Sequence, residues 1–144
     1  MRFLTLLIFL LLTLNPLHGE TLSMENIAAH IQKGVQTRIT GQNKPIIQDI
    51  YARTGGMPLW IGDKNRIRTS HLIQALNDPL FNYKNKSFDQ RSIKHLFYQL
   101  DNGEISQAKQ ASTYAKLDLV LTSSFVRLVR FIVQGDVDLS LIHI

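Results

Sequence analysis

The sequence of 144 residues contains no cysteine, only four prolines and a single tryptophan. Without a thiol, the chain has no disulfide, no Cys-based metal site and no cysteine nucleophile. Apolar residues make up 44% of the composition, enough for a hydrophobic core. A domain of this composition must therefore be stabilised by packing alone.

Strong charge asymmetry is also missing. The chain carries 16 Lys and Arg against 11 Asp and Glu, a net charge of +5. The basic residues are scattered rather than gathered on one face, which is not the pattern of a nucleic-acid-binding surface. We therefore expect no nucleic-acid partner, and only a mild attraction to anionic glycans or lipid headgroups.

The N-terminal apolar run is too short to cross a membrane. It extends over residues 3–14, whereas about 20 residues are needed to span roughly 30 Å of hydrocarbon. Arg2 precedes this run, Asn15-Pro16 follows it, and the residues before Glu20 offer a cleavage site. We predict a signal peptide at 1–19 and export to the periplasm. The alternative is an uncleaved inner-membrane anchor, and only then would a membrane be a partner.

Apolar residues are densest between Tyr114 and Asp138. Between Leu117 and Val133, only three side chains carry charge. Two helical faces are apolar, one at 117, 121, 125, 128 and 132 and the other at 119, 126, 129 and 133. A helix that is apolar on two faces is expected to be buried on both. We predict the central helix of a small all-α bundle at about residues 116–134, ended by Gly135.

The remaining sequence also favours helices. Ser23 is a good N-cap, Pro45 suits a first helical turn, and Asp89 is a second candidate cap. Trp60 lies in a short extended segment, 57–61, and is predicted to anchor the core. We find no linker, and we predict one mainly helical domain over 20–138. Its further helices are expected at 23–39, from Pro45 to Gly55, at 69–77, from Asp89 to Asn102 and at 104–115. The last is weaker and more polar, and it is either a separate helix or a continuation of the central one.

No motif for catalysis or metal binding is present. His30, His71 and His95 lie far apart and lack the spacing of zinc ligands. There is no Gly-x-Ser-x-Gly sequence to support a hydrolytic triad. We therefore predict no catalytic, cofactor-binding or metal-binding residue and no cofactor.

Asp118 and Thr122 lie four residues apart and so share one face of the predicted central helix. A charge in such an apolar helix should be paired or lie near the helix start. We interpret Asp118 as a residue of the first turn, favoured by the helix dipole, and Thr122 as hydrogen-bonded locally. Arg127 and Arg130 are interpreted as a solvated edge whose aliphatic stems cover apolar surface.

Two stretches together resemble a known family. The first is YARTGGMPLW at 51–60, and the second is LDLVLTSSF at 117–125, followed by Gly-Asp-Val-Asp at 135–138. Both are similar to motifs of the scaffold domain of the large periplasmic murein L,D-transpeptidases. The resemblance covers about residues 45–138. It departs at 80–86, where members of the family often carry a Gly-Leu-x-Pro-x-x-Tyr segment.

The resemblance implies a fragment of a larger enzyme. In that family a separate C-terminal domain carries a Ser-x-Gly-Cys-x-Arg motif and a histidine. Its thiolate attacks the stem peptide of murein, and a neighbouring stem amine resolves the acyl-enzyme into a 3-3 cross-link. None of those residues is present, so we expect the chain to be inert alone. Its implied partners are the missing catalytic domain and, further, peptidoglycan.

The last six residues, 139–144, match the in-frame translation of CTGTCTCTTATACACATC, a transposon end used in preparing sequencing libraries. We predict that they are an adapter artefact; the alternative is a natural short tail. Two functions therefore stay open at this point. One is the N-terminal scaffold part of a murein L,D-transpeptidase, and the other is a stand-alone exported helical module that binds an envelope partner or glycan.

A membrane-spanning role for residues 117–133 is less favourable. Arg127 and Arg130 would each cost about 2.5–3.5 kcal/mol at a bilayer centre. The same stretch is therefore better explained as the core helix of a folded domain.

Overall fold

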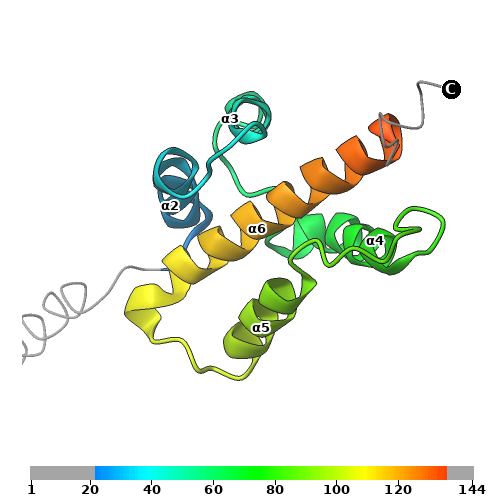
Figure 1. Ribbon diagram of the computed structural model, residues 1–144. Coiled ribbons are helices and arrows are strands. Elements are labelled where there is room, and N and C mark those ends of the chain that lie inside the picture. Colours follow the sequence, from blue (N-terminus) through cyan, green and yellow to red (C-terminus); the bar gives the residue numbers. More distant parts are fainter. Residues whose placement is uncertain (1–21, 136–144) are drawn as a thin grey trace, which may run out of the picture.

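Helix α6 (Gln107–Gln134) runs through the middle of the computed structural model, with the other helices around it (Figure 1). The structure describes residues 22–135, and within them it contains helices but no strand. The predicted all-α bundle around a central helix is thus confirmed. The predicted signal peptide and adapter residues lie outside the described residues. The remaining elements are α2 (Met24–Thr37), α3 (Lys44–Arg53), the 3-10 turn η2 (Asp63–Asn65), α4 (Arg66–Asn77) and α5 (Gln90–Asp101).

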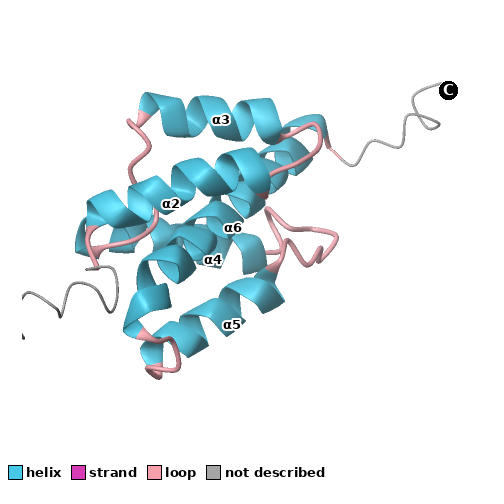
Figure 2. Ribbon diagram, turned by 90° about the vertical axis from the view of Figure 1, so that its left-hand side faces the viewer, coloured by secondary structure: helices cyan, strands magenta, loops and turns pink. Residues whose placement is uncertain are grey.

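The bundle has two halves separated by α6. Figures 1 and 2 show α2 and α3 on one side of this helix and α4 and α5 on the other. The core between them is one continuous apolar cluster to which every α-helix contributes. Within residues 22–135, no helix has the length and hydropathy needed to cross a membrane.

Helix α6 is continuous, which is one of the two alternatives left open by the sequence. The weak helix predicted at 104–115 and the central helix are one element of 28 residues. They join because neither glycine nor proline interrupts the chain between Gln107 and Gln134. The C-terminal end is as predicted, since Gly135 takes the capping position with a φ of 60°.

The expectation that both apolar faces of α6 are buried is wrong for its last three turns. Leu117, Leu121 and Leu128 are buried as predicted. Phe125, Val129, Ile132 and Val133 are exposed, because no helix within residues 22–135 covers that side of the C-terminal half. This half of α6 is therefore an open apolar surface.

Helix α2 packs closely against α6. Ser23 caps it as predicted, its Oγ accepting a hydrogen bond from Asn26 N over 3.1 Å. Gly34, a poor helix former, has a packing role here. A Cβ at that position would lie 2.4 Å from Cδ1 of Leu119 on α6. The missing side chain lets the two helices approach.

The connection from α4 to α5 departs from the predicted capping. Asp89 occupies the N-cap position of α5 as predicted, but its backbone is left-handed, φ 60°, and its side chain accepts no hydrogen bond from a backbone N–H of that helix. Its carboxylate instead accepts a hydrogen bond from Arg127 Nη1 on α6 over 2.7 Å. Helix α4 begins three residues earlier than the predicted Thr69, directly after η2.

The loop between α4 and α5 is held by Asn82, which is buried. Its Nδ2 donates to the carbonyl oxygens of Leu76 and Lys86, each over 2.8 Å. Its Oδ1 accepts from Lys86 N over 2.8 Å. The Asn82 side chain therefore acts as both donor and acceptor. It supplies hydrogen bonds to backbone groups that have no partner from regular secondary structure in this loop.

Candidate functional site

The carboxylate of Asp118 is fully buried in the middle of α6 and binds two other parts of the chain. The hydroxyl of Tyr51, on α3, donates to Oδ2 over 2.6 Å. The backbone N–H groups of Leu59 and Trp60 donate to Oδ1 over 3.0 and 2.8 Å. One carboxylate therefore holds both α3 and the loop segment 57–61 against the central helix.

Thr122 extends this arrangement by one helical turn. Its Oγ1 accepts a hydrogen bond from Trp60 Nε1 over 2.8 Å and lies 2.7 Å from the hydroxyl oxygen of Tyr51. Tyr51 gives its only hydroxyl proton to Asp118, so the Thr122 hydroxyl donates to Tyr51. We call Tyr51, Trp60, Asp118 and Thr122 the Asp118 network. Within the described residues, no buried side-chain nitrogen or oxygen lacks a partner.

The placement of Asp118 in the first turn of its helix is a wrong prediction. The helix begins at Gln107, eleven residues earlier, so the helix dipole does not explain the charge. The prediction of a local hydrogen bond for Thr122 is also wrong, because its partners lie on other elements. The general expectation that a charge in this helix needs partners does hold. Those partners are hydrogen-bond donors rather than a cation.

Burial governs the protonation of this network. Burial raises the pKa of Asp118, while hydrogen bonds from Tyr51 and from the backbone of residues 59–61 act in the opposite direction. Burial and the nearby negative charge of Asp118 raise the pKa of Tyr51. Tyr51 is consequently held as a neutral donor, which is the form that the network needs.

The network is suited to holding the fold rather than to catalysis. Asp118 and Thr122 are both 0% exposed, so no substrate reaches them. His30, His71 and His95 take no part in the hydrogen bonds of this network. Among residues 22–135, no group of three or more potential ligands could hold a metal ion. Trp60, which is 7% exposed, is the core anchor that the sequence predicts.

An open groove lies directly beside the network. It has a volume of about 530 Å³ and runs between α4 and the exposed half of α6. Ile67 is 72% exposed and Ile132 is 44% exposed, values that are unusual for large aliphatic side chains. We call it the apolar groove. It is lined by Trp60, Ile67, Arg68, His71, Leu72, Ala75, Phe81, Phe125, Leu128, Val129 and Ile132.

Trp60 connects the groove to the network. Its Nε1 donates to Thr122 in the core, while its ring lies 5.6 Å from that of Phe125, centroid to centroid. Arg68 reaches along the rim and donates to the carbonyl oxygen of Leu59 over 3.1 Å. The Asp118 network thus fixes the position of one wall of the apolar groove.

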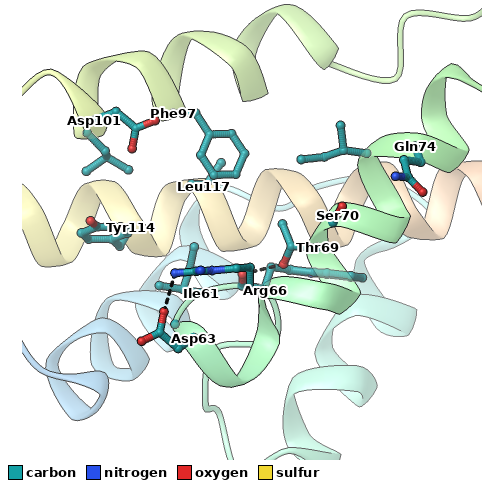
Figure 3. Close-up of a pocket in the computed structure, with 14 residues that line it drawn as sticks. Ile61, Asp63, Arg66, Thr69, Ser70, Gln74, Phe97, Asp101, Tyr114 and Leu117 are labelled. Carbon is teal, nitrogen blue, oxygen red and sulfur yellow. Dashed lines mark hydrogen bonds and ion pairs between the residues drawn. The ribbon is translucent and has the colours of Figure 1, made fainter.

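A second cavity, of about 460 Å³, lies between α4, α5 and α6. Figure 3 shows Phe97, Leu117 and Tyr114 along one side of it and the paired Asp63 and Arg66 along another. Arg66 Nη2 lies 2.7 Å from Asp63 Oδ1, and both side chains are largely exposed. No histidine lines the cavity, so its serine and threonine have no imidazole base there.

The fold and the network together define a class of protein. It is an all-α module in which buried polar residues hold the helices together. A family model described as "Scaffold domain" matches residues 45–143 of the chain. This range is more than half of the sequence and contains the whole Asp118 network. The chain belongs to the Scaffold domain family. Neither a curated protein nor a solved structure matches it.

Sequence reasoning noticed the residues of the network without seeing that they meet. Tyr51 and Trp60 stand in the first family-like stretch, and Asp118 and Thr122 stand in the second. The useful signal was a lone acid in an apolar helix, which requires buried donors from elsewhere. No sequence pattern indicates the close approach of Gly34 to Leu119, because it depends on how two helices cross.

Proposed function

We propose that this chain is the N-terminal scaffold part of a murein L,D-transpeptidase that acts in peptidoglycan cross-linking. The observation that carries the proposal is the Asp118 network itself. The two stretches that resemble the transpeptidase scaffold meet in it, through Tyr51 and Trp60 on one side and Asp118 and Thr122 on the other. The two family-like stretches therefore supply all four residues of this buried network.

The role that follows is positioning rather than chemistry. A transpeptidase of this type forms its acyl-enzyme on a cysteine thiolate, and this chain has no cysteine. The parent protein would be an acyltransferase, with the present chain as its non-catalytic part. Export to the periplasm, directed by the predicted leader, would bring the parent to its murein substrate.

The apolar groove is the proposed docking surface, and its occupant is the catalytic domain that follows in the same polypeptide. Ile132 lines the groove and Val133 is 77% exposed beside it, both in the last turns of α6. The polypeptide leaves α6 at Gly135, three residues after the groove residue Ile132, so a following domain can reach the groove without a long linker. Arg68 and His71 on the wall favour an acidic edge on that domain.

The nucleotide sequence downstream of codon 138 is the first test. The proposal requires an in-frame continuation that encodes a Ser-x-Gly-Cys-x-Arg motif. Native sequence that ends in a stop codon soon after codon 138 would overturn the proposal. It would favour a stand-alone binding module instead.

A binding experiment tests the docking surface. The 144-residue chain and the downstream catalytic domain are produced separately, and their affinity is measured by calorimetry. We expect Val129→Asp with Ile132→Asp to weaken binding at least tenfold, because two buried charges would enter the interface. Tyr98→Asp, at a 58% exposed position on α5, is the control and should bind normally.

An activity assay completes the test. The 144-residue chain alone should form no 3-3 cross-links from murein with tetrapeptide stems. Added to the catalytic domain, it should increase cross-linking, and the groove variant should not. Cross-linking by the chain alone would contradict a purely positioning role.

A further inference from the structure

A third pocket lies between α2 and α6, away from the groove and from the Asp118 network. Its volume is about 270 Å³. Its floor is formed by Gly34, Ala115 and Leu119, where the two helices come closest. We call it the α2–α6 pocket. Its walls are His30, Lys33 and Thr37 from α2, Arg38 at the C-cap of that helix, and Ser112 and Lys116 from α6.

The charged side chains that line this pocket are all basic. Lys33, Arg38 and Lys116 contribute cations, and no acidic side chain is among the lining residues. Within residues 22–135, none of these three forms an ion pair with a carboxylate. Elsewhere in the fold, arginines do pair, as in Arg53 with Asp49 and Arg127 with Asp89. Like charges brought to one pocket repel unless a ligand neutralises them.

We propose that the α2–α6 pocket binds a polyvalent oxyanion, through phosphate or clustered carboxylate groups. Two lysines and one arginine supply donors that suit such oxygens, and charge-assisted hydrogen bonds are the strong ones. The hydroxyls of Thr37 and Ser112 donate to carbonyl oxygens of their own helices, over 2.8 and 2.9 Å. Because these two hydroxyl protons are already used, the affinity for an anion depends on the three cationic side chains. This proposal does not depend on the proposed transpeptidase role.

The shape of the pocket favours a soluble anionic group over a membrane surface. Membrane-binding basic surfaces present exposed apolar side chains next to the charges. Here the apolar lining is Ala115 and Leu119, which are 2% and 3% exposed at the pocket floor. A volume of about 270 Å³ is suited to a single compact group rather than a flat array of headgroups.

Titration of the full chain tests the proposal. Inorganic phosphate and citrate serve as probes, with chloride at matched ionic strength, and backbone amide shifts are followed by NMR. We expect saturable shifts centred on residues 33–38 and 112–119. The triple variant Lys33→Gln, Arg38→Gln, Lys116→Gln should bind at least tenfold more weakly. Absence of saturable shifts in the parent chain would overturn the proposal.

A matched variant separates a specific site from general charge attraction. Lys64→Gln, Arg91→Gln, Lys94→Gln removes the same three charges from exposed positions outside the pocket. It should bind the probes as the parent chain does, and equal weakening in both variants would overturn the proposal. Sedimentation with vesicles containing anionic lipid distinguishes the source of the ligand. Binding to vesicles without binding to phosphate or citrate would assign the charges to a membrane, against the proposal.

Discussion

The hydroxyl oxygen of Tyr51 lies 2.6 Å from Oδ2 of Asp118, although 67 residues separate them in the chain. Of the hydrogen bonds to Asp118, this one closes the longest loop, and the one from Trp60 N closes the shortest. Both are buried, so neither can be exchanged for water without exposing the core. The central helix is consequently held in position against α3 and the loop segment that carries Trp60.

Removing the carboxylate should be far more damaging than neutralising it. Asp118→Ala leaves the Tyr51 hydroxyl and two backbone N–H groups without their acceptor, and should cost about 3 kcal/mol or more of unfolding free energy. Asp118→Asn keeps one acceptor oxygen and can donate to Tyr51, so about 1 kcal/mol is expected. Urea unfolding followed by circular dichroism measures both. Equal losses would mean that the hydrogen bonds contribute little.

The charge of Asp118 should make stability depend on pH in an unusual direction. Because folding raises the pKa of this carboxyl, the folded chain holds the proton more tightly than the unfolded chain does. Between the ordinary pKa of an aspartate and the raised value, the free energy of unfolding should fall as pH rises. Asp118→Asn lacks this titration. As pH rises through that window, its free energy of unfolding should therefore increase relative to that of the parent chain. A relative decline would indicate that the hydrogen bonds outweigh burial.

Thr122 can be tested by a pair of substitutions of similar size. Thr122→Val removes the acceptor of Trp60 Nε1 and the donor to Tyr51, and should cost about 1–3 kcal/mol. Thr122→Ser keeps the hydroxyl and should lose less, mainly the packing of one methyl group. Unfolding curves give the difference, and near-ultraviolet circular dichroism reports the environment of the single tryptophan. Equivalent behaviour of the two variants would argue against the hydroxyl contacts.

Gly34 should resist substitution even though alanine is the better helix former. Intrinsic propensity favours Gly34→Ala by about 1 kcal/mol, but its Cβ would lie 2.4 Å from Leu119 Cδ1. Overpacking of this kind costs about 1–3 kcal/mol, so net destabilisation is expected. In a Leu119→Ala background the clash disappears, and Gly34→Ala should then be neutral or stabilising. A double-mutant cycle measures this coupling, and additive effects would contradict the packing explanation.

The sequence pattern located most helices because their causes are local. Ser23 marks the start of α2 through a side-chain cap, and Gly135 ends α6 through its left-handed backbone. The first turns of α6 were expected as a weak helix at 104–115, and whether that helix was continuous with the central one stayed open because residues 107–113 lack an apolar stripe. Asp89 was assigned as a cap from its residue type, whereas its carboxylate binds Arg127 from another helix.

The candidate site could be predicted only in part. Asp118 and Thr122 were recognisable as unusual, since polar side chains in an apolar helix need partners. Their partners lie 58 to 71 residues away, and no periodicity encodes such distances. The apolar groove was missed for a related reason. The sequence marks Phe125, Val129 and Ile132 as apolar but cannot show that no neighbouring helix covers them.

By itself, the sequence determined the all-α class, the central helix, the role of Trp60 in the core and the absence of a thiol. These follow from composition, helical spacing and local capping, which act over a few residues. Only the tertiary structure decided where Asp118 finds its donors, which half of α6 stays exposed and which basic residues share a pocket. Those features depend on how helices distant in the chain cross, because hydrogen bonding and burial are satisfied in space rather than along the sequence.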